Sequence, residues 1–220
     1  MSFLQVDPHL CFDLSGLRAR YVEKPVDVSS YCPKDKGAWG KEVERMLRAD
    51  PLLAHLPWVS ETQGAPDMGV CEIKTVVLRP GKNGLQVTQD LAIGQLALQV
   101  FSSTLEQSPL AAKLNMLLVA LRPETFFTAR IQSIHELDFR MDAQARKDFM
   151  SMSKGFWGRH EKMGAAQAID ALGSGTEGYG KVLIAKTKGA RRRDRTRPRG
   201  LYVRARAIRR ALADSCLDRG

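Results

Sequence analysis

Residues 69–78 are the stretch that most constrains the fold of this chain. They are rich in β-branched side chains and run into the Pro/Gly/Asn turn of residues 80–84, which is typical of a strand closed by a tight turn. Side chains alternate between the two faces of a strand, so Glu72 and Lys74 share one face and the residues between and beyond them share the other. The strand therefore presents an acid and an amine side by side.

A second acid lies just before this strand. Asp67 follows Pro66, and a turn here can bring its carboxylate toward Glu72. Two carboxylates and the Lys74 amine would then converge, which is the smallest set that can hold a hard divalent cation and activate a water beside it. The alternative is an ordinary exposed strand, because a Glu-x-Lys pair is common on solvent-facing sheets.

The composition describes a globular chain without the usual signs of export. Its 220 residues suffice for one sizeable core, with or without an attached lobe, and 44% hydrophobic with 26% charged residues is ordinary for such a protein. We expect no secretory signal and no membrane-spanning segment. The four cysteines are scattered without Cys-x-x-Cys spacing, so we expect reduced thiols in a cytoplasmic protein and no zinc site.

Positive charge is concentrated in one segment. Residues 186–210 hold twelve Lys or Arg and a single acid, Asp194, so the net charge of this segment is +11. Because the whole chain carries +10, the remaining residues sum to −1 and are close to neutral. Apolar residues on both sides predict ordered flanks, which would hold the basic loop at both ends. A tethered basic loop favours a polyanionic partner, most simply nucleic acid, over a free solvated tail.

The remaining chain predicts alternating strands and helices. Residues 1–33 contain three prolines and few strong signals, and we interpret them as a loose, poorly assigned arm; residues 34–220 are interpreted as one domain. Apolar residues at helical spacing predict a helix after Asp35, with Glu44 at the margin of its apolar stripe, where a solvated glutamate is the simpler interpretation. Further elements are predicted as strands at residues 114–121, 126–139 and 181–186, amphipathic helices over 142–172, and a terminal helix over 201–212.

Glycine-rich and histidine-containing segments do not indicate a nucleotide or metal site. The glycines of residues 173–181 resemble phosphate-binding loops, but they follow a predicted helix and precede a predicted strand, the reverse of the required order. The four histidines have no metal-ligand spacing, and no Gly-x-Ser-x-Gly motif occurs. A flexible loop is the better interpretation of these glycines.

Five short blocks, in order, resemble the MutH-type DNA endonucleases, a family that includes mismatch-repair nickases and restriction enzymes cleaving at GATC. The blocks run from Lys34 to the C-terminal helix. They are Asp35-Lys36-Gly37 followed by the helical Glu44, Pro66-Asp67 with Gly69-Val70-Cys71-Glu72-Ile73-Lys74-Thr75, Lys113-Leu114, Lys186-Thr187-Lys188-Gly189-Ala190, and Pro198-Arg199-Gly200-Leu201-Tyr202. The resemblance implies an α/β (α+β) fold with a PD-(D/E)xK restriction-endonuclease-like core, a mixed central sheet flanked by helices, and two lobes around a DNA cleft.

The resemblance also implies roles for individual residues. Asp67 and Glu72 would ligate Mg²⁺, for which Mn²⁺ can substitute, with Glu44 as a further metal-binding carboxylate. Lys74 would position or help deprotonate the attacking water, and Lys113 would support the scissile phosphate. DNA would be contacted from the basic loop and terminal segment spanning 181–214, and from the first block, by Lys36, Lys186, Lys188, Arg191, Arg199 and Tyr202.

Three functions follow as hypotheses. The first is a Mg²⁺-dependent endonuclease that hydrolyses phosphodiester bonds of double-stranded DNA at or near GATC, either as a nickase with a MutL-like activator or as a restriction-type enzyme that dimerises on DNA. The second is a non-catalytic DNA-binding protein that uses the basic segment at residues 186–210. The third is a basic RNA-binding protein, although the sequence has no aromatic stacking motif that favours it.

Overall fold

The computed structural model describes residues 13–32, 35, 37–51, 53, 56, 58, 67–68, 71–82, 84–173, 175–187 and 196–217. The chain divides into two compact units, and each unit is assembled from two separate stretches of sequence. Unit 1 consists of Met1–Val87 and Asn115–Leu137, and unit 2 consists of Thr88–Leu114 and Asp138–Gly220. Each unit has its own sheet and its own buried side chains.

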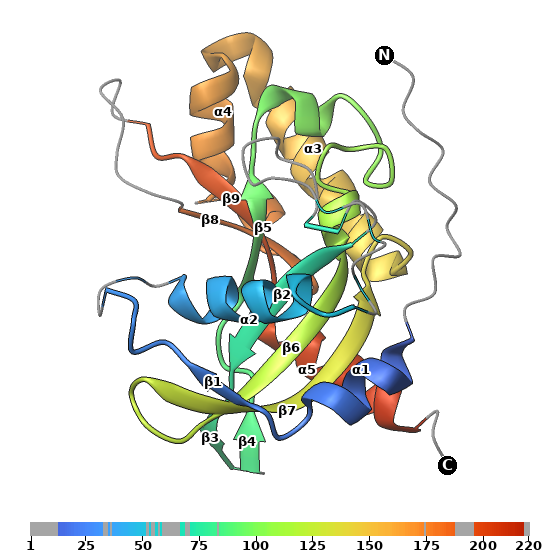
Figure 1. Cartoon of the computed structure of the whole chain (residues 1–220). Coiled ribbons are helices and arrows are strands. Elements are labelled where there is room, and N and C mark those ends of the chain that lie inside the picture. The colour runs from blue at the N-terminus through green and yellow to red at the C-terminus, as the bar shows by residue number, and fades with distance from the viewer. Residues whose placement is uncertain are drawn as a thin grey trace. The chain divides into compact units, whose positions relative to one another are not determined.

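Unit 1 is built on a four-stranded mixed sheet with the order β1-β7-β6-β2 (Figure 1). β2 (Glu72–Val77) pairs in parallel with β6 (Asn115–Pro123), whereas β1 (Pro25–Asp27) pairs antiparallel with β7 (Thr128–Asp138). After β2 the chain forms the short hairpin β3 (Arg79–Gly81) and β4 (Gly84–Gln86). β2 is thus an edge strand of the sheet, so its outer side is open to groups from the preceding loop and from a helix.

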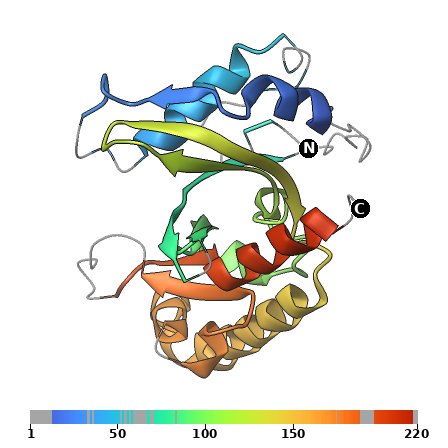
Figure 2. The ribbon, with the colours of Figure 1, turned by 90° about the horizontal axis from the view of Figure 1, so that it is seen from below.

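Two helices cover one face of this sheet. Figure 2 shows α1 (Leu14–Tyr21) and α2 (Ala38–Arg48) on the same side of the curved strands β6 and β7. Alternate residues of β6 supply the contact, because every second side chain of a strand faces the same way. The shared core contains fully buried residues of both layers: Leu17, Val43, Leu47, Leu117, Val119, Leu121 and Ile131.

The expectation of a loose arm over residues 1–33 is wrong for residues 13–32. α1 begins at an N-cap whose Asp13 carboxylate accepts the Gly16 N–H at 2.8 Å, and Leu17 and Tyr21 are buried. Pro25 starts β1, and a proline is tolerated there because β1 lies at the edge of the sheet. Of the three prolines that suggested an irregular arm, Pro25 therefore marks an edge strand, while Pro8, with the rest of residues 1–12, and Pro33 lie outside the described residues.

Unit 2 combines an antiparallel sheet with α-helices and short 3-10 turns. The sheet has the order β5-β9-β8, formed by Leu91–Gln95, Arg199–Val203 and Leu183–Thr187. The helices are α3 (Ala143–Met163), α4 (Ala165–Leu172) and α5 (Ala205–Leu217), with the 3-10 turns η2 (Leu98–Phe101), η3 (Ala112–Leu114) and η4 (Thr176–Gly178). In Figure 1, α3 and α4 are the yellow to orange helices, and the red α5 ends the chain.

The predicted terminal helix over 201–212 is only partly correct. Residues 199–203 form β9, and α5 starts at Ala205. β9 is the central strand of its sheet and is paired on both sides, so strand pairing overrides the helical spacing of its apolar residues. The predicted strands at 114–121, 126–139 and 181–186 correspond to β6, β7 and β8, with ends that differ by a few residues.

A buried carboxylate joins α3 to the start of β8. Asp148 is 5% exposed, and its Oδ2 accepts the backbone N–H groups of Val182 at 2.6 Å and Leu183 at 3.0 Å. A side chain on Gly180 would place its Cβ 2.2 Å from the Asp148 carboxyl carbon, so glycine is required there. The glycines predicted to form a loop before β8 thus include one that allows close packing.

Taken separately, both units are mixtures of helix and sheet, and the chain is an α+β protein with a curled mixed sheet flanked by helices. Among the helices of the described residues, none has both the length and the apolar character needed to cross a membrane.

Candidate functional site

The start of β2 carries Glu72 and Lys74, the expected acid and amine. Lys74 Nζ lies 2.6 Å from Glu72 Oε1, and their side chains are 20% and 5% exposed. Ile73, between them, points into the core of unit 1. The alternation of the strand therefore puts Glu72 and Lys74 together on the other side, as expected from their spacing.

Asp67 is brought to the same place by a tight turn. The Met68 N–H donates to the Cys71 carbonyl at 3.1 Å, and the Asp67 carboxylate accepts the Ile73 N–H at 2.9 Å. Burial and then the charge of Glu72 raise the pKa of Asp67 to about 6; the Ile73 hydrogen bond lowers it, and the charges of Glu44 and Lys74 act in opposite directions. Asp67, Glu72 and Lys74 thus form one cluster, the acid–amine site.

Glu44 approaches this cluster from α2 but is held by another residue. Its carboxylate accepts both Nε and Nη2 of Arg48 at 2.9 and 2.6 Å, one turn further along the helix. The Arg48 guanidinium in turn lies over the Trp58 ring, 4.7 Å from the centroid. Glu44 is close enough to raise the pKa of Asp67, but in this conformation its Oε1 accepts both hydrogen bonds from Arg48.

The two carboxylates of the acid–amine site suit Mg²⁺ better than a metal that needs an enclosing set of protein ligands. Within the part of the chain that is described, no three His, Cys, Asp or Glu side chains gather closely enough to enclose a metal ion. Mg²⁺ commonly binds through one or two carboxylates and keeps waters and substrate phosphate oxygens as its other ligands. The half-buried carboxylate of Asp67 and the buried carboxylate of Glu72 suit such an open site, because a cation would offset the burial and the repulsion by Glu72 that together raise the pKa of Asp67.

Lys113 belongs to unit 2. It lies in η3, two residues before β6 begins, and its side chain is partly exposed. Lys36, Lys188 and Arg191 were also expected to act at a site, and they lie outside the described residues.

Lys186 and Tyr202 lie next to one another in unit 2. β8 and β9 pair so that Lys186 faces Gly200 and Ile184 faces Tyr202, and the Lys186 amine lies 5.8 Å from the Tyr202 ring centroid. Asp90 holds this amine, with Nζ and Oδ2 2.5 Å apart. The lysine is 45% exposed despite the pair, so it can be reached from solvent.

Arg199 has a different environment from the one expected of a DNA contact. Its side chain is 9% exposed, and its guanidinium donates to Asp170 Oδ1 at 2.8 Å and to Thr187 Oγ1 at 2.7 Å. A Cβ on Gly173 would lie 1.9 Å from its guanidinium carbon, so the group is enclosed. This placement contradicts a direct contact with DNA: Arg199 ties the end of α4 to the β8–β9 pair.

Two residues that pair with expected site residues, one in each unit, were missed from the sequence. Arg48 stands four residues after Glu44, and an acid followed by a base at this spacing on a helix is a recognisable pairing signal. Asp90 lies 96 residues before Lys186, and no local pattern connects them.

Comparison of the sequence with models of known protein families gives no match, and comparison with curated proteins gives none either.

Proposed function

We propose that the chain is a metal-dependent endonuclease that hydrolyses phosphodiester bonds in double-stranded DNA, with the acid–amine site of Asp67, Glu72 and Lys74 as its catalytic centre. The observation that supports this proposal most strongly is the convergence of two carboxylates and one amine at the start of β2, where burial and the charge of Glu72 raise the pKa of Asp67 to about 6. A carboxyl group whose pKa is raised by burial and by a neighbouring carboxylate is typical of functional sites.

Each residue of the site has a distinct role in this proposal. Asp67 and Glu72 hold a divalent cation, preferably Mg²⁺, and the Asp67 carboxylate is oriented for this by the Ile73 N–H. Lys74 is fixed by Glu72 and presents N–H donors to the attacking water and to the phosphate. The cation, when bound, supplies charge neutralisation on the phosphate oxygens and lowers the pKa of a coordinated water.

Glu44 serves as the further carboxylate of the site in this proposal. Because Arg48 binds the Glu44 carboxylate, Glu44 has two distinguishable roles. It either leaves Arg48 and ligates the cation, or it stabilises the bound cation electrostatically from its present position. Lys113 has the role of a second phosphate contact, in line with the block Lys113-Leu114 that resembles the MutH-type endonucleases.

Unit 2 supplies the DNA-binding part. Lys186 is exposed and adjacent to Tyr202 at the end of β8 from which the basic segment departs. Lysine at this position suits the O6 and N7 acceptors of guanine in the major groove. The division into two compact units, each with its own sheet, supports the two-lobed PD-(D/E)xK architecture, and the blocks in the sequence support a GATC site.

Plasmid cleavage tests the proposal. Supercoiled plasmid with unmethylated, hemimethylated or fully methylated GATC sites is incubated with the protein and Mg²⁺, Mn²⁺ or EDTA. We expect cleavage only with the metals, and loss of cleavage by at least about 100-fold in Lys74→Ala, because an amine that stabilises a transition state contributes on this scale. A nicked circle indicates a repair-type nickase, and a linear product indicates a restriction-type enzyme acting as a dimer.

Lys82→Ala is the matched control. Lys82 is an exposed lysine in the turn between β3 and β4 of the same unit, so its loss removes the same charge without touching the site. If the Lys74→Ala variant cleaves plasmid at the rate of the wild type, the assignment of Lys74 to the catalytic centre is refuted. Salt-sensitive DNA binding without cleavage at any metal concentration would favour the alternative, a non-catalytic DNA-binding protein.

A further inference from the structure

Unit 2 contains a basic pocket that has no part in the proposed cleavage reaction. It is a depression of about 390 Å³ between the start of α3, the segment before β8, and α5. Exposed cationic side chains surround a floor of small apolar residues. The residues that line this basic pocket are Gln144, Lys181, Val182, Arg206, Ala207 and Arg210.

The geometry of α5 directs two arginines into this pocket. Arg206 and Arg210 are four residues apart on the helix and therefore lie on the same side of it. Arg206 Nε donates to the Lys181 carbonyl at 3.1 Å, which fixes the arginine against the segment that carries Lys181. The Lys181 side chain itself is exposed, so three cationic groups from two segments meet around one depression.

One carboxylate lies at the rim. Asp142, the N-cap of α3, accepts the Ala145 N–H at 2.7 Å and contacts Arg210 at 3.4 Å. A second carboxylate, Asp148, lies behind the floor, where it accepts the Val182 N–H at 2.6 Å and the Gln144 side-chain amide at 2.8 Å. Among the described residues, the three cations of the basic pocket and these two acids leave an excess of one positive charge. An excess of this size matches a phosphate group, which carries one to two negative charges.

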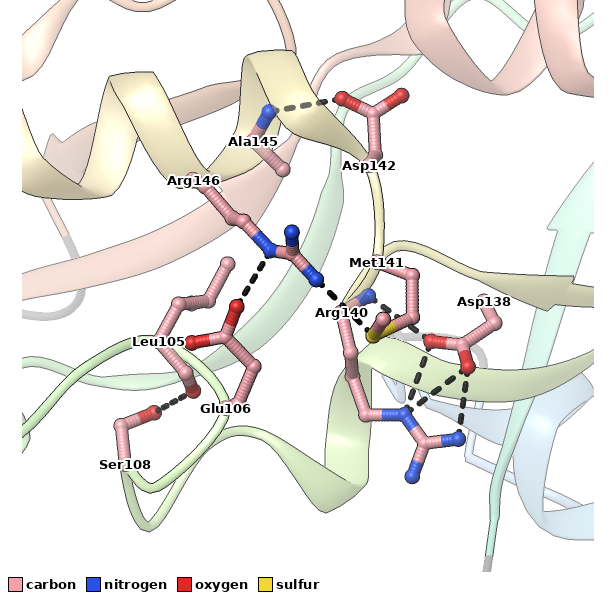
Figure 3. A network of polar contacts seen from close by, with 9 residues as sticks. All are labelled: Leu105, Glu106, Ser108, Asp138, Arg140, Met141, Asp142, Ala145 and Arg146. Carbon is pink, nitrogen blue, oxygen red and sulfur yellow. Dashed lines mark hydrogen bonds and ion pairs between the residues drawn. The ribbon is translucent and has the colours of Figure 1, made fainter.

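The neighbouring arginines of the same region are engaged elsewhere. Figure 3 shows Arg146 directed toward Glu106 and Arg140 directed toward Asp138. The shortest contact of the second pair joins Arg140 Nη2 and Asp138 Oδ2 at 2.7 Å. In the same view, the Asp142 carboxylate is directed to the N–H of Ala145. Arg140 and Arg146 are therefore held by acids outside the basic pocket, whereas the contact of Arg210 with Asp142 is long at 3.4 Å.

We propose that the basic pocket binds the phosphate group of a nucleotide unit, either free or within a nucleic-acid backbone. Arg206 and Arg210 donate to the phosphate oxygens, and Lys181 adds a third charged donor. The volume exceeds that of a bare phosphate and falls in the range of small-ligand sites, so a sugar can lie on the floor formed by Val182 and Ala207.

This pocket is separate from the residues proposed to contact bases. Lys181 precedes β8, whereas Lys186 and Thr187 lie at its other end, five or more residues along an extended strand. At about 3.3 Å per residue this places them roughly 15–20 Å apart along the strand. The pocket would therefore hold a phosphate beyond the recognition contacts of β8 and β9.

Binding is tested in EDTA, so that cleavage plays no part. Inorganic phosphate and deoxythymidine 5′-monophosphate are titrated by calorimetry, and a 20-base-pair duplex without GATC is titrated at several NaCl concentrations. The test variant is Lys181→Gln/Arg210→Gln, which removes two charges and leaves the Arg206 bond to the Lys181 carbonyl intact. The control is Lys162→Gln/Arg209→Gln, which removes the same charge from exposed sites on α3 and α5 outside the pocket.

We expect at least a tenfold loss of affinity for the small phosphates in the test variant and less than a twofold loss in the control. If the phosphate comes from DNA, the slope of log K against log[NaCl] also falls, by about 0.9 for each DNA phosphate that the variant no longer neutralises. A change confined to the small phosphates identifies a free nucleotide as the ligand, and a change confined to the duplex slope identifies the backbone.

Equal behaviour of test variant and control toward all three probes would overturn the proposal. Arg210→Gln alone serves if the double variant does not fold, because the Arg210–Asp142 pair is long at 3.4 Å. Failure of the nuclease assignment would appear separately, as wild-type protein that does not cleave plasmid in Mg²⁺, and would leave the result for the basic pocket unchanged.

Discussion

Two aspartates, one in each unit, differ in how the surrounding protein treats their charge. Asp67 in unit 1 and Asp90 in unit 2 are both partly buried, and both have a lysine nearby. Burial and the charge of Glu72 raise the pKa of Asp67 to about 6. Burial also raises the pKa of Asp90, but hydrogen bonds from Lys186 and from the Ala205 N–H, together with the charge of Arg204, bring it below its usual range.

The charge of Asp90 is balanced by its neighbours, whereas Asp67 lies beside a second carboxylate that, in the proposed function, shares a cation with it. Asp90 caps the start of α5 and pairs with Lys186, so its ionised form stabilises the fold. Ionised Asp67 lies beside Glu72 with Glu44 nearby, so its charge destabilises the fold at neutral pH. A protein that keeps such an acid at a cost in stability is expected to use it.

The most severe test of this comparison is Asp67→Asn. The substitution keeps the shape of the side chain and its acceptor for the Ile73 N–H but removes the charge that would hold a cation. We expect plasmid cleavage to fall by at least about 100-fold, equivalent to about 2.7 kcal/mol of transition-state stabilisation. Cleavage at the wild-type rate would show that Asp67 is not a ligand.

The same variant should be more stable than the wild type in the absence of metal. The folded pKa of Asp67, about 6, exceeds its unfolded value, so the folded state holds the proton more tightly and loses stability as pH rises from about 4 through 6. Asp67→Asn avoids this loss. After allowance for solvent screening we expect a gain of about 1 kcal/mol, or roughly 2–4 °C in Tm, above pH 7 and none near pH 4.

Thermal unfolding in EDTA at pH 4, 5.5 and 7.5 measures this gain. Asp27→Asn is a suitable control, because backbone and side-chain hydrogen bonds from Ser29 lower the pKa of Asp27 in the same unit. That variant should show the opposite sign, with a loss of stability at neutral pH. A lower Tm for Asp67→Asn at pH 7.5 would contradict the assignment of Asp67 as a destabilising acid.

The acid–amine site of unit 1 could be predicted from the sequence, and the Asp90–Lys186 pair of unit 2 could not. The shared face of Glu72 and Lys74 follows from strand alternation, and the approach of Asp67 follows from a tight turn only a few residues long. The pairing of Asp90 with Lys186 depends on how β5, β9 and β8 assemble, which no local pattern encodes. The same holds for Arg199, whose basic neighbours in the sequence suggested an exposed contact although its side chain is enclosed.

Arg199→Met extends the comparison to a cation and is expected to have the largest effect on stability among these variants. Removal of the guanidinium leaves Asp170 and Thr187 without their shared partner, and loss of one member of a largely buried pair costs about 3 kcal/mol. We expect Tm to fall by roughly 6–12 °C. DNA affinity, measured well below Tm, should be unchanged.

Arg197→Met is the matched control for this experiment. Arg197 is an exposed arginine two residues earlier in the same segment, so its loss should weaken DNA binding without lowering Tm. The reverse result, with Arg199→Met as stable as the wild type and defective in DNA binding, would restore Arg199 as a direct DNA contact.

The smallest effect is expected for Asp90→Asn, which tests whether Asp90 restrains Lys186, the lysine proposed to contact DNA. Asparagine can still cap α5 through the Ala205 N–H, so the loss is mainly the Lys186 pair and amounts to about 0.5–1 kcal/mol at neutral pH. Because the folded pKa of Asp90 is depressed, this difference should disappear as pH falls below about 4.

Release of Lys186 and removal of a negative charge beside it should strengthen binding to DNA without a GATC site by about two- to fivefold, a gain that high salt abolishes. Fluorescence anisotropy with such a duplex at 50 and 200 mM NaCl measures it. Weaker binding by Asp90→Asn would mean that the Asp90 contact orients Lys186 for DNA. In that case Asp90 would contribute to the proposed DNA binding of unit 2, as Asp67 contributes to the proposed cleavage in unit 1.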